Sequence, residues 1–177
     1  MVYTVQKFKI SVIILTVFFI LSGCSAKKDA SRTQAEDEVI THAGVFSPKS
    51  SQQVTSYLKQ ELKLTNMISL DIEDISVHYG FNSNYIDDFS AYASKTESCA
   101  DEIAVFKIKN SDERQTVIDA LMEKVKQKSL SYKDLNTKEF DKFSPNSVSL
   151  HGDYIVVLIC ASPDLGYQLL DEFYESK

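Results

Sequence analysis

Thiol and imidazole side chains are the first candidates for chemistry in this sequence, because both can act as nucleophiles or metal ligands. The histidines are His42, His78 and His151, and none stands at the close spacing of a metal-binding motif such as HExxH. A second possibility is catalysis in which the Cys160 thiol is the nucleophile and His151 is its base, since a hairpin would bring the two near each other. Cys160 ends an apolar run typical of a core strand, and His151 falls in a predicted turn, where it would be solvated. We therefore expect no catalytic residue, no metal ligand and no cofactor.

Carboxylates gather in one stretch, where Asp71, Glu73 and Asp74 are followed by Asp87 and Asp88. A hard cation such as calcium prefers several such oxygens, but the spacing matches no EF-hand loop. We interpret these residues as helix caps and solvated acids.

Tyrosines are a further candidate set, because a flat ring with a polar tip suits recognition of a peptide or glycan. The set includes Tyr57, Tyr79, Tyr85, Tyr92 and Tyr154. They either line a groove or rim the core, and we favour the core.

The first 23 residues have the layout of an export signal. Lys7 and Lys9 precede an apolar run from residue 10 to 21, which only Ser11 and Thr16 interrupt. A membrane-spanning helix needs about 20 apolar residues, so this run is short for a permanent span. We expect the segment to be cleaved.

Directly after this run, Leu21-Ser22-Gly23-Cys24 resembles the lipobox of bacterial lipoproteins. The resemblance implies that the thiol of Cys24 is acylated and that the chain is cut between Gly23 and Cys24. Two acyl chains would hold the protein stably on the outer face of the cytoplasmic membrane. The alternative is an uncleaved anchor with an idle thiol.

The charge of the chain limits its partners. Removal of residues 1–23 takes away two lysines and no acid, which leaves 17 basic and 25 acidic side chains and a net charge of −8. Because nucleic acid is bound mainly through lysine and arginine, we expect no nucleic-acid partner. The expected partners are the membrane, through the lipid on Cys24, and an envelope protein or peptide.

Two further cysteines, Cys99 and Cys160, would lie in a compartment that permits disulfides. Cys99 falls in a polar, turn-like stretch. The two either pair or stay apart, with Cys160 buried and Cys99 half-exposed, and we favour the unpaired arrangement.

The pattern along the chain predicts three regions. Residues 1–23 form the signal peptide, residues 24–45 a lipidated N-terminus and flexible tether, and residues 46–177 a single domain. The tether prediction rests on residues 25–38, which have no aromatic or β-branched apolar side chain and mix both charges.

Within the domain, the pattern predicts an α+β fold with a four-stranded, mainly antiparallel sheet made of two hairpins, and helices packed on it. The strands are expected in "DFSAYASK", "EIAVFKIK", "SVSL" and "YIVVLICA", and helices at 48–62, after Asn110 and after Ser162. Residues 67–80 alternate like a strand but also suit a short helix between Asp71 and Gly80, and we favour the helix.

The stretch "ADEIAVFKIKN", the helix after it and "HGDYIVVLICASPD" resemble the small Firmicutes lipoproteins that carry the domain of unknown function four-three-five-eight. The resemblance covers about residues 79–164 and implies an exported lipoprotein, without an activity or site residues. We expect a non-catalytic binding domain at the cell envelope. The alternatives are an envelope enzyme with an unrecognised site and a small solute-binding accessory lipoprotein.

Overall fold

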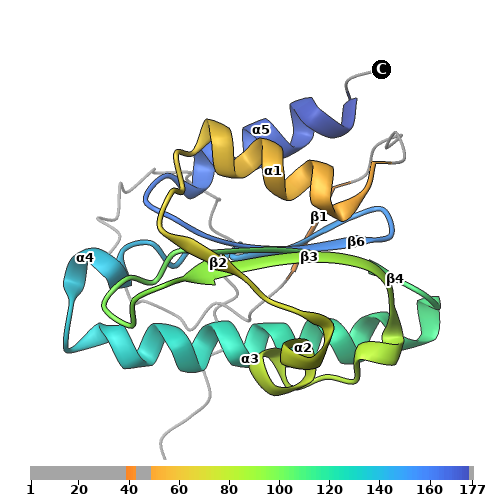
Figure 1. The fold of residues 1–177 in the computed structure, drawn as a ribbon, viewed down its shortest axis with the longest axis horizontal. Coiled ribbons are helices and arrows are strands. Elements are labelled where there is room, and N and C mark those ends of the chain that lie inside the picture. Colours follow the sequence, from red (N-terminus) through yellow and green to blue (C-terminus); the bar gives the residue numbers. More distant parts are fainter. Residues whose placement is uncertain (1–38, 43–48, 176–177) are drawn as a thin grey trace, which may run out of the picture. The chain divides into compact units, whose positions relative to one another are not determined.

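A six-stranded sheet runs through the middle of the protein, with α1 and α5 on one face and α2 and α3 on the other (Figure 1). The computed structural model describes residues 39–42 and 49–175, so the predicted signal peptide, Gly23 and Cys24 lie outside the described residues. The strands are β1 (Ile40–His42), β2 (Met67–Ser69), β3 (Ile86–Ser94), β4 (Glu102–Ile108), β5 (Val148–His151) and β6 (Tyr154–Ile159). The helices are α1 (Ser51–Glu61), α2 (Ile72–Tyr79), α3 (Arg114–Lys133), α4 (Thr137–Phe140) and α5 (Pro163–Glu175).

The predicted α+β class is confirmed, but the predicted number of strands is wrong. The sheet has the order β1-β5-β6-β4-β3-β2, in which β2 to β6 pair antiparallel and β1 pairs parallel with β5. The four predicted strands correspond to β3, β4, β5 and β6. The other two have three residues each, which is too short for a period-two pattern to stand out.

The ambiguous segment 67–80 is a strand followed by a helix. Residues 67–69 form β2 at the edge of the sheet, and α2 begins after Asp71, whose backbone N–H donates to the Asp74 carboxylate at 3.0 Å. Gly80 ends the helix with φ +79°, a left-handed conformation that glycine adopts without strain. The strand pattern and the helix pattern overlap in the sequence because only Leu70 and Asp71 separate β2 from α2.

Each face of the sheet has its own core. Val117, Ile118 and Leu121 of α3 and Ile75 of α2 pack on one face, and Val54 and Leu58 of α1 with Leu170 of α5 pack on the other. Every residue of β6 is buried, as expected for a central strand that is covered on both sides. The ends of the strands, rather than their faces, are therefore where a site could form.

Strand β1 lies within the range 24–45 that was predicted as tether. Its residues pair with 149–151 of β5, so the chain joins the sheet at the β5 edge before α1 begins.

Candidate functional site

A hollow of about 610 Å³ lies between the β3–β4 loop and the C-terminal part of α3. We call it the loop pocket. It is lined by residues 94–99 of the loop, by His78 and Ala93, and by Lys128, Ser131, Tyr132, Leu135 and Asn136. The lining offers hydroxyl, amide and ammonium groups together with one aromatic ring, which suits a polar ligand with hydrogen-bonding groups.

Glu102 is the charged centre beneath this pocket. It is the first residue of β4 and is only 1% exposed. Its Oε2 atom lies 2.6 Å from the Nζ atom of Lys128, and its Oε1 atom lies 3.5 Å from Nε2 of His78. Thus α2, α3 and the sheet each contribute one charged or titratable group to the same point.

The carboxylate of Glu102 is held in its ionised form. Burial alone would raise its pKa, but the polar contact with His78 and the positive charge of Lys128 outweigh burial and lower the pKa from 4.5 to about 2. A general base needs a pKa near the working pH, so this carboxylate is a fixed anion rather than a proton acceptor.

Tyr79 lies beside the same carboxylate. Burial and the negative charge of Glu102 both raise the pKa of Tyr79 well above its ordinary value. Its hydroxyl has no hydrogen-bond partner of normal geometry among the residues that the structure describes, and its ring packs edge-on against Phe106. Tyr79 is therefore a core residue whose hydroxyl is not available to a ligand.

The β3–β4 loop is fixed by hydrogen bonds from three side chains of the α3–α4 region. Lys128 donates to the backbone oxygen of Ala100 at 2.8 Å, and the N–H of Ala100 donates to the Glu139 carboxylate at 2.6 Å. The hydroxyl of Tyr132 donates to the backbone oxygen of Glu97 at 2.6 Å. Because the loop is held at several points, the pocket is formed before any ligand arrives.

Cys99, Asp101 and Glu139 form a cluster that could in principle ligate a metal, since one donor atom of each lies within 4.8 Å of the others. The ammonium of Lys142 lies among them, 2.7 Å from Asp101 Oδ1, 2.8 Å from Glu139 Oε2 and 3.6 Å from Cys99 Sγ. Burial alone would lower the pKa of Lys142, but its hydrogen bonds to Asp101 and Glu139 outweigh burial and raise the pKa. The cluster thus holds a lysine cation and helps to fix the loop.

His78 also lines two smaller hollows. One, of about 410 Å³, lies between β2 and α2, and the other, of about 250 Å³, lies between α2 and α3. The side chain of His78 is 29% exposed, whereas Glu102 beneath it is not accessible. His78 is therefore the accessible member of the buried charge cluster.

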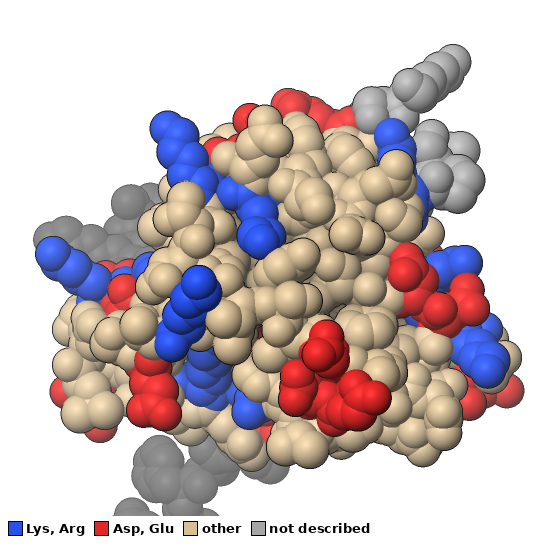
Figure 2. Space-filling model, viewed as in Figure 1, with Lys and Arg blue, Asp and Glu red and all other residues tan. Residues whose placement is uncertain are grey.

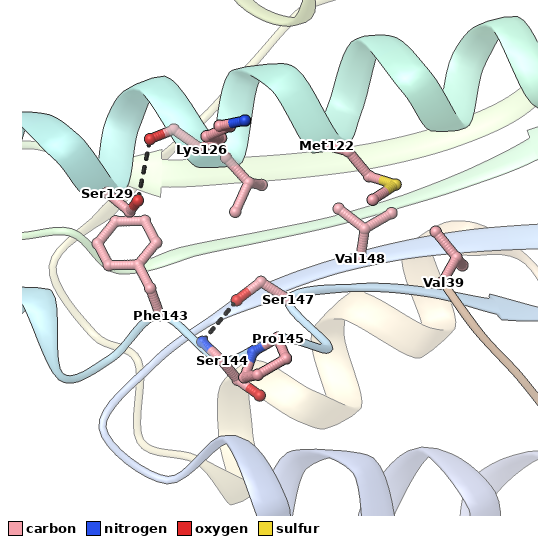
Figure 3. Close-up of a pocket in the computed structure, with 10 residues that line it drawn as sticks. Val39, Met122, Lys126, Ser129, Phe143, Ser144, Pro145, Ser147 and Val148 are labelled. Atoms are coloured by element: carbon pink, nitrogen blue, oxygen red, sulfur yellow. Dashed lines mark hydrogen bonds between the residues drawn. The ribbon is translucent and has the colours of Figure 1, made fainter. Parts of the chain in front are cut away.

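A separate, mainly apolar hollow of about 190 Å³ lies between α3 and β5 (Figure 3). Met122 and Val125 of α3, Phe143, Val148 and Val39 line it. Figure 3 shows Met122, Val148 and Val39 on one side and Phe143 on the other, with Ser144 and Ser147 joined by a hydrogen bond at 3.0 Å. Lys126, Ser129, Ser144 and Ser147 supply its polar groups.

The structure does not bring Cys160 and His151 together. His151 is paired with Tyr154 at the first residue of β6, and Cys160 comes six residues later, about 20 Å along the strand. Burial also raises the pKa of the Cys160 thiol, which makes it a poor nucleophile. Both Cys160, which is buried, and Cys99, which is half-buried, are free cysteines.

His151 is fully buried, so the expectation of a solvated turn histidine is wrong. It is the last residue of β5, and the turn itself consists of Gly152 and Asp153. Its Nε2 atom lies 3.1 Å from the Ser149 hydroxyl, and its Nδ1 atom lies 3.8 Å from Asp171. This order of serine, histidine and aspartate is that of a hydrolase triad, but Ser149 is 0% exposed and lines neither the loop pocket nor any of the three other hollows described above.

The other sequence candidates lie apart. His42 is in β1, where only the backbone is described. Asp87 pairs with Lys107 at 2.9 Å, and Asp88 accepts a hydrogen bond from the N–H of Ser51 at 2.7 Å, so these acids are bound to neighbouring elements. Tyr79 belongs to the core on the α2–α3 face, whereas Tyr57, Tyr92 and Tyr154 pack on the α1–α5 face. The tyrosines therefore do not line one groove.

Residues 60–160 match the family described as Domain of unknown function (DUF4358). The chain belongs to this family. The matched residues run from the end of α1 to the end of β6, so they contain His78, Glu102 and Lys128, and they confirm the family resemblance seen in the sequence. No curated protein and no solved structure that was compared with the chain matches it.

Sequence reasoning missed Glu102 and Lys128 as a pair. A signal was present, because Glu102 continues the inward phase of Ala104, Phe106 and Ile108 along β4. An acid at such a position requires a buried partner. Nothing local in the sequence indicates that the partner is 26 residues away on α3.

We expect Glu102→Gln to lower the free energy of unfolding by about 3–5 kcal/mol, because Lys128 would keep a buried charge without its partner. Lys128→Met should have a similar cost for the reciprocal reason. The double variant Glu102→Leu/Lys128→Met should recover most of the loss, since it removes both charges. Urea unfolding at neutral pH measures the free energy of unfolding of all three variants. If the single variants unfold at the same urea concentration as wild type, the ion pair does not stabilise the fold.

Stability should also fall in acid for a reason that is specific to Glu102. Its pKa is about 4.5 when unfolded and about 2 when folded, so the contribution is complete above pH 4.5 and is lost as the pH falls toward 2. The expected loss is on the order of 3 kcal/mol. Urea unfolding at a series of pH values should show this slope in wild type and in the exposed control Glu73→Gln. If Glu102→Gln keeps the full slope, the assignment to this carboxylate is wrong.

Proposed function

We propose that this protein is a lipid-anchored, extracytoplasmic lipoprotein whose domain binds an envelope protein or peptide without catalysing a reaction. The observation that supports the binding role is that hydrogen bonds hold the loop pocket in place. Its fixed loop provides a preformed surface, and the acidic groups beneath and beside it are held in ion pairs with Lys128 and Lys142. Acids held in this way keep the wall of the pocket in place and do not exchange protons with a ligand.

The anchor rests on the sequence at residues 21–24, where small residues precede Cys24 directly after the apolar run. None of the helices among the described residues is long and apolar enough to cross a membrane. Attachment through two acyl chains on Cys24 would supply stable membrane binding, since one chain alone is marginal.

Palmitate labelling tests the anchor directly. Cells that express wild type should incorporate labelled palmitate into the protein, and Cys24→Ala should lose the label and leave the membrane fraction. Cys99→Ala is the matched control, because it removes a thiol that lies outside the predicted lipobox and should keep the label. Labelling that persists in Cys24→Ala would contradict lipid attachment at Cys24.

A substitution inside the loop pocket tests the binding role. Ser131 is exposed and lines the pocket, so Ser131→Arg should fill it without disturbing the core. We expect crosslinking in intact membranes to recover a defined partner with wild type and with Gln115→Arg, an exposed position elsewhere on α3, but several-fold less of it with Ser131→Arg. Recovery of the same partner in equal amounts from all three would show that the pocket is not the binding site.

A further inference from the structure

Strand β2 leaves one edge of the sheet open within the described part of the chain. It is the last strand in the order and pairs only with β3. The N–H of Leu70 donates to Ala91, and the N–H of Lys95 donates to Asn66, which fixes residues 66, 68 and 70 as the hydrogen-bonded positions. The backbone groups of Met67 and Ser69 therefore point away from β3. They form a short row of donors and acceptors that a further strand could use.

Apolar side chains surround this edge. Ile68 is 46% exposed, Ile72 is 39% exposed and Val77 of α2 is 87% exposed. Ile68, Ser69 and Val77 line the hollow of about 410 Å³ between β2 and α2, which would receive a side chain from a strand laid against β2. In Figure 1, β2 lies in front of the other strands of the sheet and above α2. Figure 2, drawn from the same side, shows uncharged side chains across the middle of this face.

The charge at the edge indicates the kind of partner. Asp71, Glu73 and Asp74 are exposed at the start of α2, directly after β2, and Figure 2 shows acidic side chains together over this helix. None of the three forms an ion pair with another described residue, and Lys124 is the cation that lines the adjoining hollow. Parallel pairing of β2 with β2 of a second copy would place the two acidic groups side by side, which disfavours that arrangement.

We propose that β2 receives an extended peptide segment with alternating apolar and basic side chains, which adds to the sheet as a further strand. Its backbone pairs with Met67 and Ser69, an apolar side chain enters the hollow beside Val77, and a lysine or arginine faces the acids of α2. The inference goes beyond the proposed binding role, because it assigns a second binding surface at the β2 edge in addition to the loop pocket, and it does not depend on lipid at Cys24.

The test is a selection of random twelve-residue peptides displayed on phage against the detergent-solubilised full chain. We expect the enriched peptides to carry alternating apolar and basic residues. Ser69→Pro should weaken the binding of the best synthetic peptide by about tenfold or more, because proline removes an outward donor while the ladder to β3 is kept. Ile68→Ser should weaken it similarly, whereas Leu130→Ser, at an exposed leucine of α3 that lines none of the hollows described above, should not.

Amide hydrogen exchange provides a second readout that a folding defect cannot imitate. In the free protein the amide of Ile68 should exchange slowly and those of Met67 and Ser69 fast. Bound peptide should slow Met67 and Ser69 by about tenfold or more, as expected for newly paired amides.

Several results would overturn the proposal. They are equal binding to wild type and to a folded Ser69→Pro, enriched peptides that are acidic or show no alternation, no enriched peptide at all, and a wild-type dimer that Ser69→Pro dissociates. Each of these results is independent of whether palmitate labelling depends on Cys24 and of whether Ser131→Arg loses its membrane partner. Failure of the β2 proposal can therefore be distinguished from failure of the proposed function.

Discussion

The ion pair between Glu102 and Lys128 is the constraint on which one end of the protein depends. A carboxylate at the start of a central strand is costly to bury unless a cation and hydrogen bonds compensate it. Lys128 compensates it from α3, and His78 faces it from α2. The pair therefore fixes where both helices lie along the sheet, and the loop pocket and the hollows beside His78 exist because these helices cannot shift.

The general fold could be predicted from the sequence because the main elements carry strong local signals. Strands β3, β4 and β6 alternate or run apolar over six to nine residues, and the helices have capping residues and apolar stripes. Strands β1 and β2 were missed because a strand of three residues has no period to detect. The parallel pairing of β1 depends on contacts about 109 residues away in the chain, as between Ile40 and Ser149, and no local pattern encodes it.

The site was harder to predict than the fold, for a related reason. The residues that attracted attention in the sequence were cysteines, histidines and runs of acids, which are conspicuous by type. The residues that organise the pocket are Glu102 on β4 and Lys128 and Tyr132 on α3, and only packing brings the strand and the helix together. His151 was misjudged in the same way, since a position next to a turn can still face the core when the strand end is covered, as Tyr174 covers it here.

Ala100 links the two charge clusters of the loop through both of its backbone groups. Its carbonyl oxygen accepts from Lys128, which belongs to the Glu102 pair, and its N–H donates to Glu139, which belongs to the Lys142 cluster. These two groups belong to successive peptide bonds that share the Cα atom of Ala100, so the two clusters hold the backbone on both sides of one residue. Loss of charge at either cluster would therefore release one side of Ala100, at the point where the loop enters β4.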